Sequence, residues 1–213
     1  MKVTPVTLSG RLVRLVPLTS EHVAPLYAVA SDPELWRWTV SRIASVDDMR
    51  AYVEAALEAQ RAGTALPFVT TDAATGEVIG STRFGNIDLD NRRAEIGWTW
   101  LRRDRQRTGC NTEAKLLMLR HAFDVLGCIR VELKTDALNQ QSRAAILGIG
   151  AVEEGILRSH MVTASGRLRD SVYYSILDRE WPAVRARLEE RMTRGARGAR
   201  RARGAQGGEP RAP

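Results

Sequence analysis

The segment from residue 105 to residue 115 constrains the fold of this chain more than any other. It reads RQRTGCNTEAK and joins an apolar, strand-like run, residues 94–101, to a helical run, residues 112–126. A glycine turn between a strand and a helix directs several unpaired backbone N–H groups at one point, and the helix dipole adds partial positive charge there. The segment therefore predicts a site for an anion, most often a phosphate.

The two common nucleotide-binding motifs do not fit this turn. A P-loop requires Gly-Lys-Ser/Thr, and that tripeptide is missing after Gly109. A dinucleotide-binding turn requires GxGxxG, which is also missing, and the three strands joined by short turns that precede Gly109 are wrong for that fold. The predicted anion site is therefore of another kind.

The chain before the glycine turn is expected to form helices first and an antiparallel meander next. Ser45 and Asp48 are spaced as a capping box, and Gly63 is placed to end the helix that they begin. The expected strands are 11–16, 66–71, 78–86 and 93–101, and the expected helices are 20–30 and 45–63.

The chain after the glycine turn is expected to continue as a βαβ unit. A strand at 129–135 would follow the helix and lie parallel to strand 93–101. Asn139 would cap a helix at 140–147, and two strands, 152–161 and 168–177, would precede a last helix, 181–192.

Charge separates the chain into two parts. Of 32 basic and 25 acidic residues, six arginines and one acid lie in residues 193–213, so this segment carries +5 of the net +7. It reads mainly Arg, Gly and Ala and offers too little apolar surface to offset the entropy of ordering. We therefore expect a single domain, residues 1–192, and a disordered tail, residues 193–213.

The cysteines and the hydropathy of the chain indicate in which cellular compartment it is expected. Cys110 and Cys128 form no CxxC pair, and clustered histidines are missing, which argues against zinc and against a disulfide framework. We see no signal peptide and no apolar run near the ~20 residues that span a bilayer. The expectation is a cytoplasmic protein with no metal and no membrane partner.

Four motifs in order resemble the GNAT acetyltransferase superfamily, and within it the branch of ribosomal-protein alanine N-acetyltransferases. They cover roughly residues 8–182 and are Glu95-Ile96-Gly97, the run 106–115 beginning Gln-x-x-Gly, Asn139-x-x-Ser142, and Glu154-Gly155-x-Leu157-Arg158. The resemblance implies an α/β (α+β type) fold with a mixed, mostly antiparallel sheet of about seven strands flanked by helices. It also implies a splayed cleft for acetyl-CoA and a primary amine as acetyl acceptor.

The resemblance assigns the donor-binding residues. The pyrophosphate of acetyl-CoA would rest on the N–H groups of the glycine turn, and the pantetheine arm would pair with the end of the third meander strand like an added strand. Asn139 would bond the pantetheine amides. The donor-binding residues are then Thr99, Trp100, Leu101, Gln106, Arg107, Thr108, Gly109, Cys110, Asn111, Thr112 and Asn139.

Two residues are candidates for proton transfer. Glu95 matches the Glu-Ile-Gly of the branch and would act as the base or bind the amine; a simple ion pair with Arg93 is the structural alternative. Ser142 would protonate the leaving thiolate, unless its hydroxyl only bonds its own helix. Trp36 and Trp38, in a loop expected to cover the cleft, are candidates for substrate contact.

Two other functions remain open at this point. The arginine-rich tail suggests a nucleic-acid-associated protein, although the body shows no recognition helix and no aromatic RNA platform. A sensor that binds acyl-CoA without turnover would use the same donor residues. Neither the acceptor, whether a protein N-terminus or a small-molecule amine, nor a possible homodimer can be read from the sequence.

Overall fold

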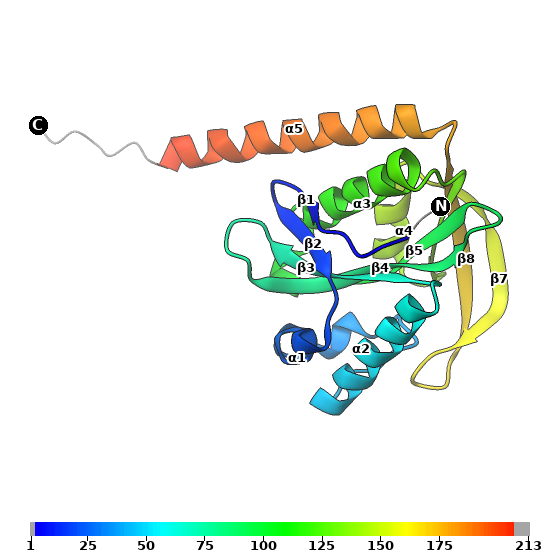
Figure 1. The fold of residues 1–213 in the computed structure, drawn as a ribbon. Coiled ribbons are helices and arrows are strands. Elements are labelled where there is room, and N and C mark those ends of the chain that lie inside the picture. Colours follow the sequence, from blue (N-terminus) through cyan, green and yellow to red (C-terminus); the bar gives the residue numbers. More distant parts are fainter. Residues whose placement is uncertain (1–2, 207–213) are drawn as a thin grey trace, which may run out of the picture.

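A computed structural model describes residues 3–206, with side chains described as far as residue 194. One sheet of eight strands forms the centre, in the order β1-β2-β3-β4-β5-β6-β8-β7 (Figure 1). The strands are β1 Leu8–Ser9, β2 Val13–Pro17, β3 Leu66–Asp72, β4 Val78–Asp88, β5 Arg93–Leu101, β6 Arg130–Asp136, β7 Val152–Val162 and β8 Leu168–Leu177. This confirms the predicted mixed, mostly antiparallel sheet, with the two-residue β1 as an additional strand.

Helices cover both faces of the sheet (Figure 1). One face carries α1 Val23–Ala30 and α2 Val46–Arg61, which pack on a cluster that contains Val69 and Trp100. The other face carries α3 Cys110–Arg120, α4 Gln140–Gly148 and α5 Trp181–Gln206. Each face therefore has its own apolar core. No helix within residues 3–206 is long and apolar enough to cross a membrane.

The start of α2 shows how local sequence sets an element boundary. The Ser45 hydroxyl accepts a hydrogen bond from the Asp48 N–H (3.1 Å), and the Asp48 carboxylate accepts one from the Ser45 N–H (2.9 Å). Gly63, just past the helix, has φ +73°, a conformation that glycine adopts at little cost. The predicted capping box and the predicted helix end are both confirmed.

One pair of neighbouring strands opens the sheet. β5 and β6 run parallel and pair only through the first residues of each strand, from Arg93 with Arg130 to Glu95 with Glu132. Beyond these pairs β5 continues to Leu101 and β6 to Asp136 without pairing to each other. The predicted splayed gap is therefore present.

A bulge in β5 lies at this gap. The register between β4 and β5 shifts so that Ser81 faces Trp100 while Arg83 faces Gly97, which places Trp98 and Thr99 opposite Thr82 alone. Trp98 has φ +50°, which is costly for a bulky residue. A Cβ atom at Gly85 would lie 2.3 Å from the Trp98 ring, so Gly85 provides the space that the indole needs.

The structure differs from the predicted elements mainly around two helices. α3 begins at Cys110, before the predicted 112, and its continuation from His121 to Val125 is a π-helical turn. α5 extends through Gln206, beyond the predicted end at 192, since Ala and Arg favour helix even where glycines interrupt them. The tail predicted to be disordered from 193 thus begins as a continuation of α5, and residues 207–213 lie outside the described residues.

Candidate active site

The glycine turn directs backbone N–H groups at one point. Gly109 has φ +95° and is the N-cap of α3, so the first N–H groups of that helix have no carbonyl one turn earlier to bond. Arg107 is also left-handed, with φ +59°. A run of residues in alternating conformations makes a concave group of N–H donors that suits an anion. The geometry agrees with the anion site that the sequence predicts.

Side-chain hydrogen bonds hold this turn against its neighbours. The Gln106 amide nitrogen donates to the Leu101 carbonyl at the end of β5 (3.0 Å), and the Gln106 amide oxygen accepts from Gln141 of α4 (3.3 Å). The Thr108 hydroxyl donates to the Arg105 carbonyl (2.7 Å). The turn is thus tied to the end of β5 and to α4, the helix that follows β6.

Glu113 connects the same helix to the first strands. Its buried carboxylate accepts hydrogen bonds from the N–H groups of Arg11 (3.0 Å), Leu12 (2.6 Å) and Val13 (2.8 Å). A Cβ atom at Gly10 would lie 2.4 Å from this carboxylate, so glycine is needed for the approach. Glu113 therefore fixes the start of β2 next to the glycine turn.

A cleft of about 1260 Å³ runs from the glycine turn into the gap between β5 and β6. Its lining is rich in positive charge, with seven basic residues and two acids: Arg11, Arg103, Arg107, Lys115, Lys134, Arg169 and Arg191, against Asp32 and Glu34. Such a lining attracts a polyanionic ligand.

The structure brings most of the predicted donor-binding residues together in this cleft. The lining includes Thr99, Trp100, Leu101, Gln106, Arg107, Thr108, Gly109, Asn111, Thr112 and Asn139. Cys110 is the exception, because its side chain is buried in the core between α3 and the sheet and does not line the cleft. Only its backbone can belong to the anion site.

The start of α4 provides two further lining residues. The Asn139 side chain accepts a hydrogen bond from the Ser142 N–H (3.0 Å), which confirms Asn139 as the N-cap. This bond occupies the Asn139 amide oxygen and leaves its amide nitrogen able to donate to a ligand. The Ser142 hydroxyl forms no hydrogen bond with another side chain or backbone group of the described residues and lines the cleft.

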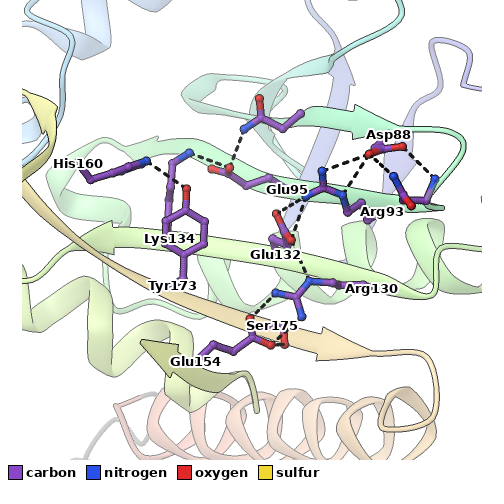
Figure 2. A network of polar contacts seen from close by, with 12 residues as sticks. Asp88, Arg93, Glu95, Arg130, Glu132, Lys134, Glu154, His160, Tyr173 and Ser175 are labelled. Carbon is purple, nitrogen blue, oxygen red and sulfur yellow. Dashed lines mark hydrogen bonds and ion pairs between the residues drawn. The ribbon is translucent and has the colours of Figure 1, made fainter. Parts of the chain in front are cut away.

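Glu95 lies beside the cleft rather than in its lining. The side chain is buried; its carboxylate accepts hydrogen bonds from Lys134 Nζ (2.9 Å) and from the Asn86 amide (2.8 Å) (Figure 2). The alternative ion pair with Arg93 is not formed, because Arg93 binds Asp88 (3.1 Å) and Glu132 (3.3 Å) instead. Lys134, which lines the cleft, connects Glu95 to it.

Lys115 is a cleft residue that the sequence reasoning did not single out. It is 5% exposed, and its ammonium donates to the hydroxyls of Thr99 (2.6 Å) and Thr82 (3.5 Å), while no carboxylate within residues 3–206 pairs with it. Burial lowers the pKa of Lys115 to about 7. The sequence signal was a lysine between Ala114 and Leu116, on a helix whose inner side is apolar.

The far end of the cleft is formed by the loop that follows α1 and by β8. Trp38 lines it, as expected, but Trp36 packs in the core against Trp100, with its ring nitrogen donating to the Ala30 carbonyl (2.9 Å). Arg169 of β8 also lines this end and was likewise missed. The prediction of substrate contact for Trp36 was wrong, because its indole is satisfied within the protein.

His160 of β7 lies near the Glu95–Lys134 pair (Figure 2). One ring nitrogen bonds the Ser171 hydroxyl (3.0 Å), and the ring packs edge-on against Tyr173. Its pKa is lowered by burial and by the positive charges of Lys134 and Arg169. Within residues 3–206, no group of three or more His, Cys, Asp or Glu side chains is arranged to hold a metal ion.

Comparison with known proteins connects this geometry to a family. Residues 12–152 match the family described as the acetyltransferase (GNAT) domain. A Bacillus subtilis (strain 168) protein provisionally named ribosomal N-acetyltransferase YdaF is 37% identical over 106 residues, which cover 50% of this chain and 57% of YdaF. The chain thus spans little more than half of that relative.

Two solved structures extend the likeness over most of the chain. A GCN5-related N-acetyltransferase from Brucella melitensis is 32% identical, with a TM-score of 0.82 over 89% of this chain and 86% of that one. Mycobacterium smegmatis RimJ, solved in complex with CoA-disulfide, is 26% identical, with a TM-score of 0.74 over 84% of this chain and 90% of that one.

Proposed function

The chain belongs to the GNAT acetyltransferase family, and we propose that it transfers an acetyl group from acetyl-CoA directly to a primary amine. One observation supports this most strongly. The only parallel strand pair within residues 3–206, β5 and β6, separates next to the left-handed glycine turn at the start of α3, and the shared cleft carries an excess of positive charge. A phosphate-rich donor with a long, strand-like arm is complementary to such a cleft.

The donor would be bound mainly by backbone groups. The N–H groups of residues 107–112 would hold the pyrophosphate. The unpaired edge of β5 from Thr99 to Leu101 would hydrogen bond the amides of the pantetheine arm, and the free amide nitrogen of Asn139 would donate to the same arm. RimJ was solved with a CoA derivative, which supports the same ligand class here.

The chemistry requires proton transfer at two points. The attacking amine must be neutral and must lose a proton, and the departing thiolate must gain one. Glu95 would accept the first proton through a water, because its carboxylate reaches the cleft only by way of Lys134. Ser142 would supply the second proton, since its hydroxyl lines the cleft without a partner among the described residues.

Acetyl transfer can be tested by the release of free CoA thiol with a panel of amines. The panel would include peptides that begin with Ala or Ser, because the provisional name of YdaF points to ribosomal proteins, together with polyamines and amino acids. We expect acetyl-CoA consumption that depends on one class of amine. Tight binding of acetyl-CoA without transfer to any amine would instead indicate an acyl-CoA sensor.

A further inference from the structure

Arg169 is a buried cation at the far end of the cleft that no carboxylate of the described residues neutralises. The residue is only 7% exposed, and it lines the cleft. Its Nε donates to the Ser171 hydroxyl (3.1 Å), and its Nη1 donates to the Trp38 carbonyl (3.4 Å). Both acceptors are neutral, and Nη2 has no hydrogen-bond acceptor among the residues whose side chains the structure describes.

The carboxylates whose charge reaches Arg169 are already paired. These are Asp136 and Glu95. Asp136 is bound by the Arg167 guanidinium and by the Leu138 N–H (2.9 Å), and Glu95 is bound by Lys134 (2.9 Å). Three cations therefore share two carboxylates, and one positive charge remains, at Arg169.

Arg83 is a second buried arginine on this face of the sheet, but its surroundings differ. Its guanidinium lies over the rings of Trp98 (4.7 Å) and Tyr52 (5.1 Å), which attract a cation, and it does not line the cleft. Arg169 has no such aromatic contact within residues 3–206. It is therefore the cation that is open to a ligand.

Arg169 lies on the face of the sheet opposite the glycine turn. Val172, Tyr174 and Ile176 of β8 belong to the core beneath α3 and α5, so the alternate residues Arg169 and Ser171 point to the face that α1 and α2 cover. Lys134 and Trp98 also line the cleft. The glycine turn at Gly109 lies on the other face, at the start of α3.

An unpaired buried charge is costly, and a protein keeps one where a ligand supplies the missing partner. The uncompensated charge is a single one, which matches a carboxylate better than a doubly charged phosphate. The planar guanidinium, with Nη2 still free, has the geometry to donate to a carboxylate oxygen. Burial lowers the pKa of Arg169, in agreement with a desolvated cation that lacks a partner.

We propose that the acetyl acceptor is an amine that also carries a carboxylate, and that Arg169 binds this carboxylate while the amine faces the gap between β5 and β6. The inference rests on the proposed acetyl transfer and names the chemical class of its acceptor. Two sources share this chemistry: the α-carboxylate of a free amino acid, and an acidic side chain next to the N-terminus of a protein.

Matched acceptors that differ only in the carboxylate test the proposal. One arm compares L-alanine with L-alaninamide and β-alanine with β-alaninamide, and the other compares amidated peptides that begin Ala-Asp and Ala-Asn. We expect the wild-type protein to acetylate the acid of at least one pair with about 10- to 100-fold higher kcat/KM than its amide. The arm that shows the preference identifies the source of the carboxylate.

Variants of Arg169 test whether this side chain carries the preference. Arg169→Gln should reduce the acid-to-amide ratio to about one, and Arg169→Lys, which keeps the charge, should retain part of it. Arg179→Gln removes an exposed arginine after β8 and should leave the ratio unchanged. Thermal unfolding of each variant separates a loss of preference from a loss of fold, and the Lys variant remains informative if the Gln variant does not fold.

The outcomes distinguish this inference from the proposed function. Amides acetylated as well as acids, no transfer to any acid while acetyl-CoA still binds, or an unchanged ratio in both Arg169 variants would each overturn the inference alone. A protein that does not bind acetyl-CoA in calorimetry would overturn the proposed function and the inference with it.

Discussion

Lys115 shows how a single residue can conflict with its surroundings. Its ammonium is buried and donates to the hydroxyls of Thr99 and Thr82. No carboxylate among the described residues pairs with it. The pKa falls from 10.5 to about 7 because burial disfavours the charged form. At neutral pH the folded protein thus holds a group that is only partly protonated, whereas the unfolded chain holds it fully protonated.

This difference predicts a pH dependence of stability. Because the folded-state pKa is depressed, the unfolded chain binds more protons between about pH 7 and the unfolded pKa, and the free energy of unfolding rises with pH in that window. This gain is therefore lost progressively as the pH falls from 10.5 toward 7, and below about pH 7, where both states are protonated, Lys115 no longer makes the free energy of unfolding depend on pH. Relative to Lys115→Met, wild-type protein should gain ~2 kcal/mol between pH 7 and pH 9, as measured by urea unfolding. Parallel curves for the two proteins would show that Lys115 does not titrate in this way.

Glu95 is expected to accept a proton during acetyl transfer. Glu95→Gln keeps the size of the side chain but removes the proton acceptor, so turnover should fall by about 100-fold while the affinity for acetyl-CoA changes little. Glu132→Gln is the matched control, because Glu132 is the strand partner of Glu95 but pairs with Arg93 and Arg130 instead of with Lys134 (Figure 2). Equal kcat values for wild type and Glu95→Gln in the amine assay would exclude Glu95 as the base.

At the scale of elements, the approach of α3 to β2 depends on one carboxylate. Glu113→Ala would leave the partly buried N–H group of Leu12 and the buried N–H group of Val13 without acceptors, at a cost of ~2–5 kcal/mol of unfolding free energy. Urea denaturation compared with Glu54→Ala, on the exposed side of α2, measures this cost. A loss no larger than that of the control would mean that water replaces the carboxylate.

The glycine turn before α3 is expected to determine the affinity for acetyl-CoA. Gly109→Val forces a β-branched residue into φ +95° and places its Cβ 3.2 Å from Leu12, so the N–H groups should lose their arrangement and acetyl-CoA affinity should fall by about 100-fold or more. Gly76→Val imposes similar strain at φ +75° in the turn before β4, with nothing within 4 Å. It should lower stability without changing affinity, and equal affinities for both variants would contradict the role of the glycine turn.

The elements themselves were predicted well where local chemistry decides them. The capping box of Ser45, the stop at Gly63 and the bounds of β5 follow from hydrogen bonds and turn conformations within a few residues. The bulge at Trp98 could not be predicted, because it depends on the register of β4 against β5 and on the space that Gly85 leaves. The direction of Glu95 is a tertiary property for the same reason, since its partners come from β4 and β6.

At the scale of the whole molecule, the cleft is a product of topology. α3 connects the parallel strands β5 and β6, and its N-terminus therefore lies at the end of β5, where the two strands separate. The residues of the cleft come from positions as distant as Arg11 and Arg191. Motifs in sequence order predicted most of the residues that line the cleft at the glycine turn and at the end of β5. Arg169 and Lys115 were missed because a buried charge cannot be distinguished from a surface charge without the fold.

Calorimetric titration of the 213-residue chain with acetyl-CoA is the most direct test of whether the cleft between β5 and β6 binds acetyl-CoA. We expect saturable binding with one site per chain, weakened by added salt because basic residues such as Arg107 line the cleft. No heat of binding up to high micromolar acetyl-CoA, with the protein shown to be folded, would contradict it.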